Sequence, residues 1–69
     1  MLTDVEIRAG ISLLQRIIAN HGATAALELL RRNPAAADML ALAWEEDPSL
    51  DWGDADHVMS EYVYERAAS

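Results

Sequence analysis

The strongest constraint on the fold lies near the start of the chain, where a helix start signal precedes residues of helical period. Thr3 and Glu6 have the spacing of a capping box, in which each side chain accepts a bond from the other residue's backbone N–H group. At about 100° per residue, one narrow arc holds four apolar residues: Ile7, Ile11, Leu14 and Ile18. This spacing predicts an amphipathic helix that ends near Asn20 or His21, with Gly22 as a left-handed terminator.

Gly10 lies inside the same apolar arc, where a glycine costs up to about 1 kcal/mol relative to alanine. A glycine at such a position indicates close approach of another helix. We favour a helix of the same chain, and a helix crossing at a homodimer seam is the alternative.

Three further helices are predicted between the remaining break signals. Thr24 is a candidate N-cap for a short helix that ends at Arg32. Asn33 is a candidate N-cap before Pro34, which suits the first position of a helix that runs to Glu46. A turn-rich connector over residues 47–53 separates this helix from a last one over residues 54–67. No segment shows the alternation that is typical of strands.

The expected fold is therefore all-α, a small bundle of four helices in a single domain over residues 1–69. Of the 36 hydrophobic residues 13 are alanine, so only 23 are bulky enough to build a core. Chains with so thin a core often gain stability by association, and a homodimer is a second expectation. The periodicity predicts these core residues: Ile7, Ile11, Leu14, Ile18, Leu27, Leu30, Leu40, Trp44, Val58 and Tyr62.

The charge of the chain, net -7, is concentrated in its second half. Residues 1–37 carry four arginines against three acids, whereas residues 38–69 carry nine acids against Arg66 alone. Six of the acids lie within residues 45–56, which include no basic residue. Such a run is often only a solvated face, but here it begins at the negative end of a helix dipole, where each acid costs roughly 0.3–1 kcal/mol.

Local rules broken in this way are often found at functional sites. The aromatic residues point to the same half, since Trp52 lies in the connector and Tyr64 lies off the apolar face of the last helix. Aromatic side chains are enriched in binding hot spots, although we slightly favour packing in the core or at its rim for both. The candidate partner-binding residues are Glu45, Glu46, Asp47, Asp51, Trp52, Asp54, Asp56 and Tyr64.

Catalysis is not expected, because the chain has no cysteine, no serine in a nucleophile motif and no glycine-rich phosphate loop. Asp54, His57 and Glu61 share a helix face, but one helix supplies too few ligands for a closed metal site. No cofactor or metal is predicted. The helix from Pro34 to Glu46 has no basic residue, which argues against direct DNA binding. No apolar run is long enough for a membrane span.

The composition and charge thus favour a non-catalytic, cytoplasmic protein-binding module that regulates or inhibits a partner with a basic surface. One alternative is a nucleic-acid mimic, whose carboxylates occupy phosphate sites on a host defence complex. In size and style the chain is similar to small accessory proteins of phages and mobile elements, which fits both hypotheses. A second alternative is a structural subunit of a homo-oligomer.

Overall fold

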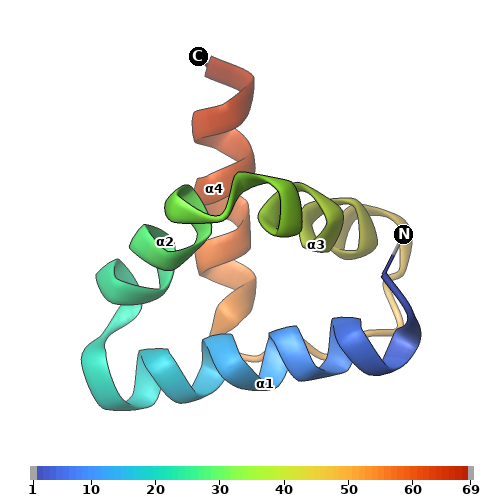
Figure 1. Ribbon diagram of the computed structural model, residues 1–69, viewed down its shortest axis with the longest axis horizontal. Helices are drawn as coiled ribbons and strands as arrows, with labels where there is room; N and C mark the ends of the chain where they lie inside the picture. Colours follow the sequence, from blue (N-terminus) through green and yellow to red (C-terminus); the bar gives the residue numbers. More distant parts are fainter. Residues whose placement is uncertain (1, 69) are drawn as a thin grey trace.

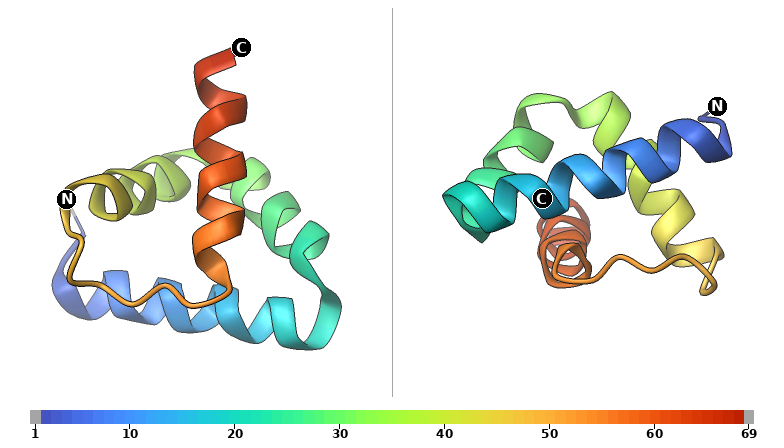
Figure 2. Two further views of the ribbon diagram at one scale, coloured as in Figure 1. Left: turned by 180° about the vertical axis from the view of Figure 1, so that it is seen from behind. Right: turned by 90° about the horizontal axis from the view of Figure 1, so that it is seen from below.

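Four helices make up nearly all of the computed structural model, which describes residues 2–68. They are α1 (Asp4–His21), α2 (Ala23–Arg32), α3 (Pro34–Glu46) and α4 (Ala55–Ala68). Figure 1 shows α1 along one edge of the molecule, with α2 and α3 forming a bent arm above it. Helix α4 stands behind this arm and crosses it (Figure 2). The predicted all-α bundle of four helices is confirmed.

The start of α1 is formed as predicted, and its end differs in detail. The Thr3 side chain accepts a hydrogen bond from the Glu6 backbone N–H at 3.2 Å, and the Glu6 carboxylate accepts one from the Thr3 backbone N–H at 3.2 Å. Gly22 ends the helix with φ 90° and ψ 164°. This is an extended conformation with positive φ that is essentially restricted to glycine, and not the predicted left-handed helical one.

One predicted capping role, at the start of α2, is wrong, and the one at its end is confirmed in position only. Thr24 is not the N-cap, because α2 already begins at Ala23 and Gly22 occupies the capping position. Asn33 is the N-cap residue of α3, but its side chain caps nothing there. Its amide Nδ2 instead donates to the backbone oxygen of Leu29 at 2.9 Å. Asn33 therefore closes the helix before it, and Pro34 starts the next one.

The buried side chains of all four helices form one cluster. Seven of the ten predicted core residues are buried, and Ile7, Ile18 and Trp44 pack against the cluster from partly exposed positions. The buried residues outside that set of ten are Ala26, Ala37, Trp52, Ala55 and Met59. Gly10 of α1 faces Leu40 of α3, where a Cβ atom would lie 3.0 Å from a Leu40 methyl carbon. This confirms the interpretation of Gly10 as a close approach within the chain.

The connector between α3 and α4 runs along α1, as the view from behind in Figure 2 shows. It is fixed there by Gln15 of α1, whose amide Nε2 donates to the backbone oxygen of Trp52 at 3.0 Å. A Cβ atom at Gly53 would lie 2.7 Å from the same Gln15 nitrogen, and Gly53 has a φ of 53°. The positive φ favours glycine at this turn into α4, and a larger residue would also displace the Gln15 amide from its bond to Trp52.

The molecule measures 29 × 25 × 19 Å, with a radius of gyration of 10.9 Å. Among residues 2–68, no helix combines the length and the apolar character that a membrane span requires.

Candidate functional site

The acidic segment 45–56 is folded back on itself, because the end of α3 is tied to the start of α4. The indole Nε1 of Trp44 donates to the carboxylate of Asp56 at 2.8 Å. One of the predicted partner-binding acids therefore has a structural partner within the chain. The exposed side chain of Asp56 still lies at the surface, so its carboxylate contributes to the surface charge while it holds Trp44.

Glu45 and Glu46 are exposed and line two different hollows. Glu45 lies beside Leu42 and Val63 in a shallow depression between α3 and α4. Glu46 lies beside Leu2 in a depression near the start of α1. Within residues 2–68, neither glutamate has a hydrogen bond or an ion pair. The two acids remain unpaired at the negative end of the α3 dipole.

Asp47 and Asp51 each close a local turn. The carboxylate of Asp47 accepts hydrogen bonds from the Ser49 hydroxyl and from the Ser49 backbone N–H, the latter at 3.0 Å. These two bonds, helped by the positive charge of Arg8, hold the pKa of Asp47 below its ordinary value. Asp51 accepts a bond from the Gly53 backbone N–H at 3.0 Å. Because such turns stabilise the folded connector, neither acid needs a partner to explain its presence.

The assignment of Trp52 to a partner-binding surface is wrong. Its side chain is only 4% exposed and belongs to the central cluster of the bundle. The indole Nε1 has no hydrogen-bond partner among the described residues, so the ring contributes through apolar packing alone. A ring that is enclosed to this degree offers no area to another protein.

The outer face of α4 is the aromatic and acidic surface that the structure leaves open. We define it by four exposed residues at helical spacing: His57, Ser60, Glu61 and Tyr64. Tyr64 is 76% exposed and has no hydrogen bond within residues 2–68. The opposite side of the helix is buried in the core through Val58, Met59 and Tyr62. Asp54 is exposed just before the helix begins.

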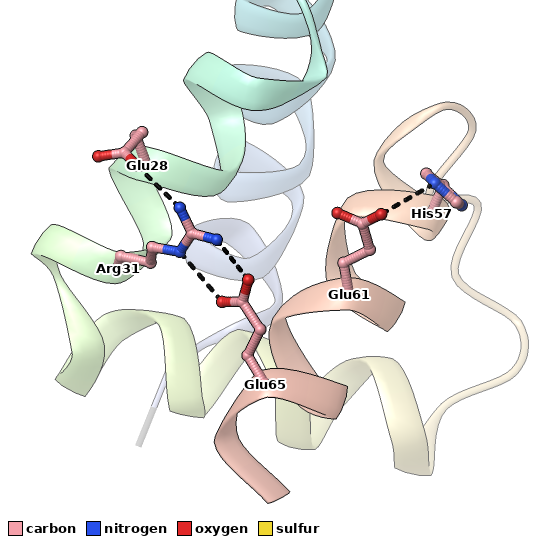
Figure 3. A network of polar contacts seen from close by, with 5 residues as sticks. All are labelled: Glu28, Arg31, His57, Glu61 and Glu65. Atoms are coloured by element: carbon pink, nitrogen blue, oxygen red, sulfur yellow. Dashed lines mark hydrogen bonds and ion pairs between the residues drawn. The ribbon is translucent and has the colours of Figure 1, made fainter. Parts of the chain in front are cut away.

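Figure 3 shows how polar contacts arrange this part of α4. The imidazole of His57 lies 3.4 Å from the carboxylate of Glu61, the pair predicted from their spacing. Glu65 forms an ion pair with Arg31 of α2, which also contacts Glu28 at 2.8 Å. The pair with Arg31 lowers the pKa of Glu65. The positive charge of Arg31 is therefore neutralised by two carboxylates.

A second set of polar contacts lies on the side of α4 that faces α3. The Tyr62 hydroxyl donates to Asp38 at 2.8 Å, and the Arg66 guanidinium donates to the other carboxylate oxygen at 2.9 Å. The bonds from Tyr62 and Arg66 hold the pKa of Asp38 below its ordinary value. Burial, together with the bond to Asp38, raises the pKa of Tyr62. These contacts fix α4 against α3 and leave its outer face unobstructed.

The lowered pKa values of Asp38, Asp47 and Glu65 lead us to expect a stability contribution that is lost in acid. The folded chain favours the ionised carboxylates, and the unfolded chain takes up protons first as the pH falls. The contribution is thus complete above the ordinary pKa values of 3.8 for Asp38 and 4.5 for Glu65, and it disappears as the pH falls through the lower folded values. Thermal melts of the native chain and of Asp38→Asn test this expectation.

The difference in melting temperature between the two proteins should be largest at neutral pH and should vanish in strong acid. Glu45→Gln is the matched control, because it removes a carboxylate that has no partner within residues 2–68. A difference for Asp38→Asn that is independent of pH would contradict the role of its charge.

The structure thus places the predicted site residues in different surroundings. Tyr64, Asp54 and Asp56 lie on or beside the outer face of α4, and Glu61 and Ser60 join them. The sequence did contain a signal for Glu61, since it lies three residues before Tyr64 and four after His57. Among residues 2–68, no three side chains of the metal-binding types come together as a metal site. No protein-family model, curated protein or solved structure matches this chain.

Proposed function

We propose that this chain is a non-catalytic protein-binding module that uses the outer face of α4 to dock on a basic surface of a partner and so regulates or inhibits it. The exposure of Tyr64, at 76%, carries the proposal. Tyrosine is enriched among residues that dominate binding energies, because its ring adds a large contact area with few rotatable bonds. Tyr64 has this exposure without any hydrogen bond within residues 2–68 that would explain it.

The charge around Tyr64 supports a basic partner. Carboxylates of Asp54, Asp56 and Glu61 lie on or beside the outer face of α4, and the sequence has no lysine or arginine between Arg32 and Arg66. Arg31 is occupied by Glu28 and Glu65. A field of one sign accelerates the encounter with an oppositely charged surface and disfavours acidic partners.

Replacement of Tyr64 by alanine should weaken partner binding by about 10-fold to 100-fold or more, as expected of a hot-spot aromatic residue. The free energy of unfolding should change by less than about 0.5 kcal/mol, because the ring is exposed. The control is Val5→Ala, since Val5 is also 76% exposed but lies in the first turn of α1. Affinity capture from the native host with the three proteins in parallel identifies partners that Tyr64→Ala loses and Val5→Ala retains.

The same partner then tests the role of charge. The double variant Asp54→Asn with Glu61→Gln removes two carboxylates and keeps side-chain size, so it should slow association and reduce the salt dependence of binding. If the native chain and Tyr64→Ala bind the partner equally well, the outer face of α4 is not the binding surface. Competition by duplex DNA would identify the partner's site as a phosphate-binding one, and the chain would then be a nucleic-acid mimic.

A further inference from the structure

An apolar groove of about 510 Å³ lies between α1 and the bend that joins α2 to α3, and no residue of α4 lines it. Buried Leu14, Leu30 and Leu40 form its floor. Only two polar residues, Glu6 and Asn33, line it, and both already have hydrogen bonds within the chain. The helices that line the groove face the viewer in Figure 1.

The wall that α1 contributes to the groove carries one bulky exposed residue and two small ones. Leu13 is 46% exposed on this wall, although the neighbouring Leu14 is buried. Ala9 and Gly10 lie one turn earlier and leave the groove open beside them. An exposed leucine and the space beside two small residues thus lie next to each other on one helix. Two copies related by a two-fold axis would each place Leu13 against the small residues of the other.

We propose that the groove is covered by a second copy of this chain, with the two α1 helices packed antiparallel. Glu6, Ala9, Leu13 and Arg16 follow one another at spacings of three and four, so they form a single stripe along α1. In an antiparallel pair that sets Ala9 opposite Leu13, Glu6 lies opposite Arg16 at both ends of the contact. Arg16 has no ion pair or hydrogen bond within residues 2–68.

The distribution of charge also favours a second copy on this side. The groove is lined only by residues between 2 and 40, a range in which four arginines balance four acids, whereas residues 41–69 carry eight acids against Arg66 alone. Two chains of net charge -7 can therefore meet here while their acidic segments remain apart. A standard interface buries about 800 Å² of each partner, about a sixth of the 4578 Å² surface of this chain.

This inference does not depend on the proposed function, because no residue of α4 lines the groove, and α4 stands behind the other helices in Figure 1. Tyr64→Ala should leave self-association unchanged, and a variant that is defective in self-association can still be tested for partner binding. Failure of one proposal is therefore distinguishable from failure of the other.

Sedimentation equilibrium over a range of concentrations tests the proposal on the intact chain. The native protein should approach twice the mass of one chain, and Leu13→Asp should raise the dissociation constant at least about 100-fold, because it brings a charge into an apolar contact. Leu42→Asp is the matched control, since Leu42 is 45% exposed but lies on α3 outside the groove. Circular dichroism verifies folding, and Ala9→Glu at an exposed groove position is a second test if Leu13→Asp unfolds.

A double-mutant cycle of Glu6→Gln and Arg16→Gln tests the antiparallel orientation. The two residues are ten apart, so about 15 Å of helix separates them within one chain, and glutamine preserves the capping box. Each change should weaken the dimer by about twofold to tenfold, and the second change should add little to the first. Additive effects would overturn the antiparallel pairing. Three results would overturn the second copy as occupant of the groove. The chain could stay monomeric at millimolar concentration, Leu13→Asp and Leu42→Asp could have equal effects, or the groove could bind a foreign amphipathic helix instead.

Discussion

Leu14→Ala is expected to lower the free energy of unfolding by about 2–5 kcal/mol, the range found for leucines truncated in well-packed cores. Leu14 is 2% exposed and is among the largest fully enclosed side chains of the bundle. It joins the face of α1 to the central cluster, so its removal leaves a cavity that four short helices cannot easily close. Urea denaturation followed by circular dichroism measures the effect.

Leu42→Ala is the control for this measurement, because Leu42 is 45% exposed and should cost well under 1 kcal/mol. A domain of this size has little stability to lose, so Leu14→Ala can abolish the cooperative transition. Leu14→Met then supplies a measurable variant, with an expected loss below about 1.5 kcal/mol. A loss below about 0.5 kcal/mol for Leu14→Ala would place Leu14 at the surface and contradict the packing of α1.

Trp52→Ala should destabilise the chain by about 3–5 kcal/mol, although this residue lies outside every helix. Its indole ring fills the core under the connector at 4% exposure. The bond from the Gln15 amide to the backbone oxygen of residue 52 remains possible in the variant, so the loss reports on the packing of the ring. Thermal and urea denaturation measure the loss, and the remaining Trp44 gives a fluorescence signal for the α3–α4 contact.

Tyr64→Ala is the control that separates a core aromatic residue from a surface one, with an expected change below about 0.5 kcal/mol. Trp52→Phe gives a graded variant, since it retains an aromatic ring and removes the buried N–H group that has no partner among residues 2–68. Its cost should be smaller than that of Trp52→Ala. Similar stability losses for Trp52→Ala and Tyr64→Ala would refute the assignment of one ring to the core and the other to the surface.

The helices themselves could be predicted because their signals are local. The capping box of Thr3 and Glu6 and the proline at position 34 act within one helical turn, so tertiary contacts need not be known. The 3.6-residue period likewise identifies which side of a helix is buried, and seven of ten predicted core residues are buried. The least reliable predictions were the capping roles of Thr24 and Asn33. A capping hydrogen bond competes there with other hydrogen bonds that the same side chain or backbone groups can form.

The candidate site was predicted in part, because a linear pattern places charges along the chain but not in space. Sequence spacing predicted the His57–Glu61 pair and the surface position of Tyr64. It could not show that Trp44 holds Asp56 or that Ser49 and Gly53 occupy the carboxylates of Asp47 and Asp51. The acids that looked alike in the sequence therefore divide into structural and unpaired ones.

Local sequence signals are enough to predict that this chain forms four helices, where each begins and ends to within a few residues, and which face of α1 is buried. The tertiary structure decided which element meets which: that Gly10 admits Leu40, that Arg31 reaches Glu65 across 34 residues, and that Trp52 enters the core. The physical reason is that helical period fixes only the direction of a side chain around its own axis. Whether that direction leads to solvent, a groove or another helix depends on how the helices cross, and the close packing of all four at once settles that.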